Sequence, residues 1–287
     1  MAALLDIVLD RVKRDFEIEE PQWENVDMEN EDLKFLEGEC IKDSEFDPTN
    51  KRNKMFNGMA DGSMYTVQAE CAYGRILGVF EDPAQIGEMP WGLWARILRM
   101  FSESERKPFK VFFLAHKSLR EFPPGKKPIS PENINGGYTY RCDPETIVIY
   151  RAEDATRVLI HELQHSCCLD RTENSLDEIE AETEAWAELF YQAIMSRGQK
   201  YMFKDLIKRQ SEWMRKQNAK VKYHMRSQKD FPWRYTIGKQ EIWEKWGILS
   251  HDDLKPAIKQ VDSLRLTYPP GKIFKERFRV AETSTIL

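Results

Sequence analysis

Apolar positions along this chain recur in two kinds of spacing, one helical and one extended. Leu5, Leu9, Val12 and Phe16 share one face of an amphipathic helix near the start of the chain. Longer stripes of the same kind, each with a polar opposite face, predict further helices. These helices are expected over residues 91–104, 153–168, 176–196 and 201–225.

Short runs rich in Val, Ile, Phe and Tyr predict strands. One is the apolar run 110–115, and two more, 137–141 and 146–150, flank a four-residue turn that contains Asp and Pro. The order helix, strand, paired strands, helix, helix predicts an α+β fold, in which a small mixed sheet carries packed helices. We expect an irregular segment rich in Trp and Pro after residue 225. The predicted domains are an N-terminal helix and acidic segment (1–60), a core (61–200) and a mostly helical C-terminal part (201–287).

The composition is that of an ordered chain without a membrane span. Of 287 residues, 41% are hydrophobic and 32% are charged. The longest apolar runs fall far short of the roughly 18 residues that a membrane span needs. Asp6 and Asp10 interrupt the apolar N-terminal stretch, so we expect no signal peptide. The five cysteines form no CxxC pair, which favours free thiols in a reducing intracellular, cytoplasmic compartment.

Charge is unevenly distributed along the chain. Residues 17–47 hold thirteen acidic residues against two lysines, and residues 201–229 hold nine basic residues against two acidic ones. Either the two segments are solvated surfaces, or they attract each other, or each of them attracts a different partner. The basic helix 201–229 is a candidate surface for an acidic or nucleic-acid-associated partner, although its basic residues lie on several faces.

The most informative stretch lies within the predicted 153–168 helix and reads His161-Glu162-Leu163-Gln164-His165. Residues four apart lie on the same helix face, so the two imidazoles can direct ring nitrogens at one ion about 2 Å away. Glu162 is rotated ~100° from His161, too far round to be a ligand but within reach of a water on the metal. The sequence therefore predicts His161 and His165 as zinc ligands and Glu162 as the catalytic base.

A catalytic zinc site needs one more protein ligand. The motif and the Glu184 that follows it after eighteen residues resemble the gluzincins, the zincin peptidases typified by thermolysin and the metallo-aminopeptidases. The resemblance covers residues 146–191, and it implies a zincin-like fold, a third ligand at Glu184 on the next helix, and Glu188 as hydrogen-bond partner of a ligand histidine. Thr183 and Glu188 depart from the Asn and Asp usual in that family. Open alternatives for the third ligand are Glu180, Asp177 and Cys168.

This ligand set predicts a zinc-dependent peptidase that hydrolyses peptide or protein substrates. Zinc would activate a water, and Glu162 would accept its proton and pass it to the leaving amine. The resemblance implies a Tyr or His from a downstream domain as oxyanion stabiliser, with Tyr223 and His224 as candidates and Tyr235 as another. The alternative function is a zincin-like scaffold that binds zinc and serves protein or nucleic-acid association without turnover.

The glycine-containing strand before the motif offers a way to hold substrate. In zincins the strand at this place is the open edge of the sheet. An extended peptide can add to such an edge as one more strand, because its N–H and C=O groups are unpaired. We therefore expect Gly136-Gly137-Tyr138-Thr139-Tyr140 to bind substrate through its main chain.

Overall fold

The computed structural model describes residues 2–102, 107–249 and 261–269, and these residues form two compact units. Unit 1 comprises residues 2–17, 119–135, 169–249 and 261–269, and unit 2 comprises residues 18–102, 107–118 and 136–168. One unit is helical and the other holds a sheet, so the predicted α+β class is confirmed. The predicted division into 1–60, 61–200 and 201–287 stays a prediction, and residues 250–260 and 270–287 of its last part lie outside the described residues.

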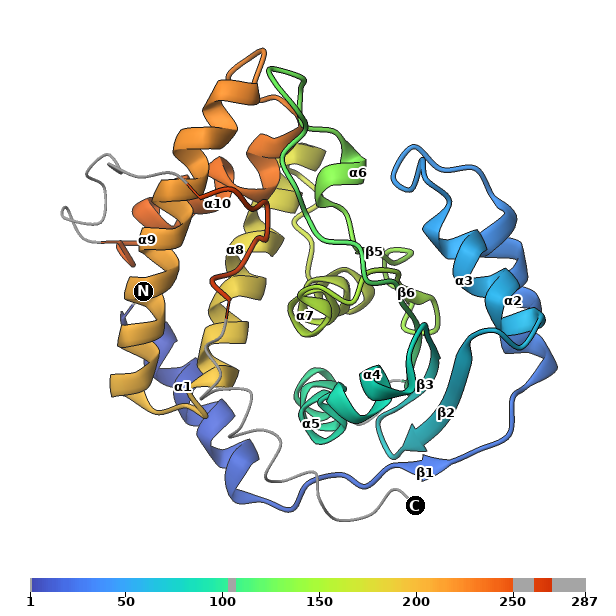
Figure 1. The fold of residues 1–287 in the computed structure, drawn as a ribbon. Coiled ribbons are helices and arrows are strands. Elements are labelled where there is room, and N and C mark those ends of the chain that lie inside the picture. Colours follow the sequence, from blue (N-terminus) through green and yellow to red (C-terminus); the bar gives the residue numbers. More distant parts are fainter. Residues whose placement is uncertain (1, 103–106, 250–260, 270–287) are drawn as a thin grey trace. The chain divides into compact units, whose positions relative to one another are not determined.

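Unit 2 is built on a mixed sheet, which has six strands among the described residues (Figure 1). Neighbours β3, β4 and β6 run parallel, whereas β1–β2, β2–β3 and β5–β6 are antiparallel. The order across the sheet is β1-β2-β3-β4-β6-β5, so β5 is an end strand. The strands are β1 (Glu24–Asn25), β2 (Tyr65–Cys71), β3 (Gly74–Phe80), β4 (Phe109–Ala115), β5 (Gly137–Tyr138) and β6 (Ile147–Ile149).

Alternate residues of each strand point to opposite faces of this sheet, and helices cover both faces. Leu36 and Met55 of α2 (Asn30–Ile41) and α3 (Lys51–Ala60) pack with Leu77 and Phe112 on one face. On the other face the Trp94 ring of α5 (Trp91–Phe101) lies 5.2 Å from that of Phe113. Trp94 also donates from Nε1 to Oγ1 of Thr156 in α7 (Ala155–Ser166) at 2.9 Å, which joins the two helices. A short helix, α4 (Pro83–Glu88), follows β3.

Unit 1 is helical, and its core gathers residues from distant parts of the chain. Ala181, Val221 and Trp233 pack together with Leu264. Trp243 donates from Nε1 to the carbonyl of Ala185 at 3.1 Å. No helix in the described parts of the chain is long and apolar enough to cross a membrane. The helices are α1 (Ala2–Glu17), α6 (Pro131–Ile134), α8 (Leu176–Met195), α9 (Lys200–His224), the 3₁₀ helix η1 (Phe231–Tyr235) and α10 (Ile237–Lys245).

The four later helices expected from the sequence appear as α5, α7, α8 and α9, each with ends within a few residues of the expected ones. One expectation was wrong and one element was missed. The segment after residue 225, expected to be irregular, contains η1 and α10, and Trp233 and Trp243 are buried in the unit 1 core. The missed element is the hairpin β2–β3, whose two loop residues, Ala72 and Tyr73, include neither Gly nor Asn. Residues 103–104 of the expected 91–104 helix lie outside the described residues.

The acidic segment 17–47 forms ion pairs inside unit 2. Asp32 lies 3.1 Å from Nζ of Lys110 and 3.6 Å from Nε of Arg75. Asp47, which is 1% exposed, lies 3.3 Å from Nε of Arg52 and accepts hydrogen bonds from the first backbone N–H groups of α3. These carboxylates therefore hold α2 and α3 in place. Within unit 1, basic residues of segment 201–229 form the pairs Lys216–Glu212, Arg209–Asp205 and Lys229–Glu178.

Candidate metal site

The HExxH motif lies on α7, a helix that is buried on nearly all sides. Leu159, Ile160 and Leu163 are fully buried. His161 and Glu162 are only 6% and 5% exposed on the same helix. Burying ionisable groups among apolar side chains costs free energy unless they are paired or coordinate a metal. The motif therefore places two ionisable side chains in the interior of the protein.

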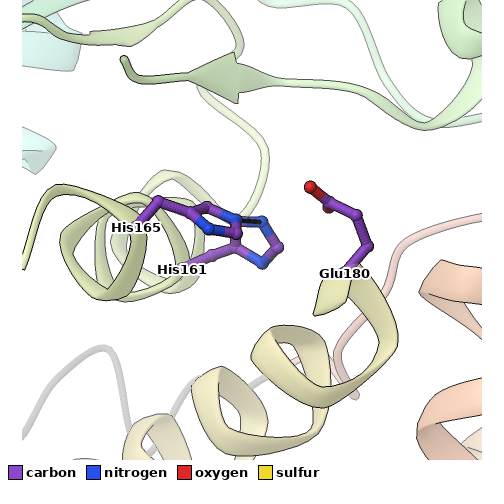
Figure 2. A group of neighbouring side chains, drawn as sticks. All are labelled: His161, His165 and Glu180. Atoms are coloured by element: carbon purple, nitrogen blue, oxygen red, sulfur yellow. Dashed lines mark hydrogen bonds between the residues drawn. The ribbon is translucent and has the colours of Figure 1, made fainter. Parts of the chain in front are cut away.

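The two motif histidines direct their rings at a common point (Figure 2). Their Nε2 atoms are 3.0 Å apart, and the ring planes meet at 71°. Two ligands of a tetrahedral zinc with bonds of about 2.0–2.1 Å have their nitrogens about 3.3–3.4 Å apart. A shift of a few tenths of an ångström would therefore let both rings bind one ion. Imidazole nitrogen is a common ligand of zinc, so the donor set fits this metal.

The backbone at the end of α7 is held from two directions. The carbonyl oxygen of His165 accepts hydrogen bonds from the N–H groups of Cys142 and Cys168, at 3.0 and 3.1 Å. A disulfide joins the same two cysteines, whose Cα atoms are 4.7 Å apart. The ligand candidate His165 is thus fixed to the loop between β5 and β6.

The expectation of five free thiols was therefore wrong for Cys142 and Cys168. Both residues have positive φ, 62° and 58°, and these turns bring together two cysteines that are 26 residues apart in the sequence. Spacing alone could not reveal the pair. Cys40, Cys71 and Cys167 are buried and stand outside this disulfide. Burial raises the pKa of the Cys40 thiol to about 12, so this thiol is unreactive. Cys142 and Cys168 therefore no longer support the inference of a reducing compartment, which was based on free thiols. Because Cys168 forms a disulfide, it cannot serve as a thiolate ligand.

Glu162, the predicted base, lies against the end strand β5. A Cβ atom built on Gly137 would lie 3.3 Å from Oε1 of Glu162 and 2.6 Å from Cγ1 of Val158. A larger residue at this position would have to displace Val158, so the glycine lets the strand backbone lie this close to α7. In the sheet, Gly137 is paired with Ile149 of β6. The base and the end strand are therefore neighbours within one unit.

Strand β5 is also tied to the two helices on one face of the sheet. Tyr138 donates its hydroxyl proton to Oε2 of Glu39 at 2.8 Å and accepts from Nη1 of Arg52 at 2.9 Å. Tyr140 donates to Oε1 of Glu39 at 3.1 Å. Burial holds the pKa of Tyr138 above its usual value, so its hydroxyl remains a donor. These bonds fix β5 beside Glu162.

The carboxylates considered as third ligand lie on α8 in unit 1. Its N-terminus is set by a capping box, in which Ser175 and Glu178 each accept a hydrogen bond from the other's backbone N–H. Glu180, drawn with the two histidines in Figure 2, is partly exposed, and its carboxylate is a group that can bind a metal ion. Glu184, one turn further on, is 2% exposed, and its Oε2 lies 4.0 Å from Nζ of Lys239. Asp177 forms an ion pair with Arg234 at 2.7 Å.

Glu188 has a set of partners that the sequence did not reveal. Its Oε1 accepts from Thr267 at 2.6 Å and from Gln192 at 2.7 Å, and its Oε2 lies 3.2 Å from Nζ of Lys239. Both Glu188 and Lys239 are fully buried. Glu188 therefore balances a buried ammonium group in unit 1. The hydrogen bond to a ligand histidine, implied by the resemblance, stays a prediction.

Tyr223 and His224, the candidate oxyanion stabilisers, lie at the C-terminal end of α9. His224 is 3% exposed, stacks on the ring of Phe122 and donates from Nδ1 to the carbonyl of Lys127 at 2.8 Å. Tyr223 is 55% exposed, whereas Tyr235 is buried in the unit 1 core. Tyr223 and His224 line a pocket of unit 1, and their catalytic role stays a prediction.

Comparisons with known proteins found no match to this chain among protein-family models, curated proteins or solved structures. The interpretation of the site therefore depends on the residues of this chain. Three relationships within unit 2 carry it: the converging pair His161 and His165, the fixed carbonyl of His165, and the proximity of Glu162 to Gly137. The first follows from helical spacing in the sequence. The other two depend on tertiary contacts that no spacing encodes.

Proposed function

We propose that this protein is a zinc-dependent peptidase of the zincin type. The observation that carries the proposal is the arrangement on α7, where two imidazoles converge while the intervening Glu162 lies beside the end strand β5. A zinc-binding role alone would need the two histidines. It would not need a buried carboxylate next to a strand that a peptide can join.

His161 and His165 would supply two ligands, and the resemblance to the gluzincins implies a carboxylate of α8 as the third. Two candidates stand one turn apart. The spacing from the motif supports Glu184. Its carboxylate also lies near the Lys239 ammonium, which competes with a metal for it. Glu180 lies on the same face of α8 as Glu184 and gives a shorter linker from the motif, so it is the second candidate. Metal measurements on single variants separate the two.

When bound, zinc would supply Lewis acidity, which would stabilise the charge that develops on a substrate carbonyl and lower the pKa of a water. Glu162 accepts the proton of the attacking water on its carboxylate and passes it to the nitrogen of the leaving amine. The burial of Glu162 excludes competing solvent from this carboxylate. Tyr223 and His224 remain the candidates for binding the oxyanion.

Strand β5 holds the substrate in an extended conformation. Among the described residues, β5 pairs with β6 and is the last strand at that end of the sheet. A peptide that pairs with the other side of β5 would have its backbone close to Gly137, and therefore close to the carboxylate of Glu162. Recognition through the main chain tolerates many side chains. We therefore expect cleavage of diverse sequences.

The decisive experiment replaces the base alone. Glu162→Gln keeps the shape of the side chain, so we expect the zinc content to stay at the wild-type value. Hydrolysis of a mixed peptide library, followed by mass spectrometry, should fall by roughly 10²- to 10⁴-fold. Glu24→Gln, an exposed change in β1 at the opposite end of the sheet, is the matched control and should change neither quantity. Undiminished cleavage by Glu162→Gln would refute the mechanism. Zinc binding without turnover in the wild type would favour the scaffold function instead.

A further inference from the structure

A cavity of about 530 Å³ lies within unit 1, away from the motif helix in sequence. The loop 122–125 forms one wall, and Lys220, Tyr223 and His224 at the end of α9 form the other. Its size is in the range of cavities that bind small ligands or a few residues of a peptide. The side chains around it combine lysines with aromatic rings.

Lys220 of the lining and Lys126, which follows the loop 122–125, are each held in position by a ring. Nζ of Lys220 lies 4.4 Å from the ring centre of Phe122, and Nζ of Lys126 lies 5.3 Å from that of Tyr223. Cation–π attraction at these distances restricts the ammonium groups, so less entropy is lost when they bind an anion. Lys220 also pairs with Asp262, but the Asp262 side chain is 91% exposed. Such a surface pair contributes little, and an incoming anion can replace it.

The lining also offers hydrogen-bond acceptors to a ligand. His224 donates from Nδ1 to the Lys127 carbonyl, so Nε2 of the neutral ring is an acceptor. Pro123 and Pro124 have no N–H, and their backbone offers only carbonyl oxygens. The pocket therefore suits a ligand that has both an anionic group and N–H donors.

We propose that this pocket binds an acidic segment of a peptide or protein, with a carboxylate at Lys220 and Lys126 and backbone N–H groups facing the acceptors. A nucleic-acid strand would bring phosphates but no backbone N–H donors. The rings it would need for base stacking already contact Lys220, Lys126 and His224.

This inference concerns unit 1 alone and goes beyond the proposed peptidase activity. Binding should persist in Glu162→Gln and in His161→Ala, so failure of the peptidase proposal would leave it standing. The lysines of the pocket, and not the charge of the whole basic segment, are expected to determine affinity. This distinction can be tested on α9 itself, because the same helix carries the exposed Lys208 outside the pocket.

The experiment measures fluorescence anisotropy of a short fluorescein-labelled peptide of alternating Glu and Gly at ~0.15 M salt. Lys220→Gln and Lys126→Gln should each weaken binding by about tenfold, the size expected for one lost hydrogen bond to a charged group. Lys208→Gln should leave the affinity unchanged. Circular dichroism and the melting temperature show whether each variant is folded, and Lys126 is an exposed loop residue whose replacement should not disturb folding.

Two further probes identify the ligand chemistry. The same peptide with Gln in place of Glu should bind at least tenfold more weakly, and inorganic phosphate should compete poorly. Equal binding of the Glu and Gln peptides, or equal weakening by Lys208→Gln, would overturn the proposal. Tighter binding of single-stranded oligothymidylate than of the Glu peptide would assign the pocket to nucleic acid and overturn it as well.

Discussion

Gly137 and Glu162 are in close proximity: a Cβ atom added to Gly137 would lie 3.3 Å from Oε1 of Glu162. They belong to the end strand β5 and to α7, and they are 25 positions apart in the sequence. The proximity connects the predicted base to the strand that we expect to hold substrate. It also makes Gly137 a position where a single methyl group should have a measurable effect.

Gly137→Ala should displace β5 from α7. The new methyl group would meet Cγ1 of Val158 at 2.6 Å and the carbonyl oxygen of Val148 at 3.0 Å, both too close. We expect a loss of stability of about 1–3 kcal/mol, typical of overpacking, measured by urea denaturation. Peptide cleavage should fall with a raised KM, while zinc content is kept. Gly38→Ala is the matched control, because nothing lies within 4 Å of its added Cβ. A variant with wild-type KM would mean that substrate does not approach β5.

The ligand assignment predicts an order of zinc loss among single variants. His161→Ala and His165→Ala should each lose the metal, because each removes one of two converging nitrogens. Either Glu180→Ala or Glu184→Ala should remove the third ligand. That variant should weaken zinc binding by more than the roughly 10- to 100-fold effect of losing a residue that only hydrogen-bonds to a ligand. The other should stay within that range. Metal content after dialysis, measured by mass spectrometry, decides between them. Full zinc occupancy in the double histidine variant would disprove the site.

How far the sequence predicted this molecule depends on whether a feature is local. Helix α7 and the convergence of His161 and His165 follow from positions four apart on a helix, which is a local property. The β2–β3 hairpin was missed because its strands lack a strong turn signal, and their pairing is a tertiary property. The end position of β5 agrees with the expectation of an edge strand.

The contacts around the site could not be read from the sequence for the same reason. The Cys142–Cys168 pair and the partnership of Glu188 with Lys239 join residues 26 and 51 positions apart. No periodicity encodes such distances. The glycines of the segment 136–140 were expected to let a substrate backbone come close. That Val158 and Glu162 lie against Gly137 was known only from the structure.

The Cys142–Cys168 disulfide should contribute to the stability of unit 2. Its closed loop spans 26 residues, for which chain entropy gives a contribution of about 3.5 kcal/mol. Reduction of the wild type, or Cys142→Ser, should lower the free energy of unfolding by up to this amount in guanidinium titrations. Reductant should not affect the Cys142→Ser variant further, and this serves as the control. If oxidised and reduced wild type unfold at the same midpoint, with the bond verified by mass spectrometry, the disulfide does not stabilise the fold.

The contact between β5 and α2 should make stability depend on pH in the acid range. Burial, the largest influence on Glu39, raises its pKa, but hydrogen bonds from Lys42, Tyr138 and Tyr140 outweigh it and hold the pKa below the usual value. The unfolded chain, with a Glu pKa of about 4.3, thus binds more protons in this range than the folded one. The stabilisation is complete above that value and is lost as pH falls through the folded pKa. Glu39→Gln should therefore be less stable than wild type near neutral pH, and the difference should shrink as pH is lowered below about 4. Urea midpoints across this range measure it, with Glu24→Gln as a control whose difference from wild type should stay near zero. A difference for Glu39→Gln that is constant with pH would show that the charge of Glu39 does not hold β5 to α2.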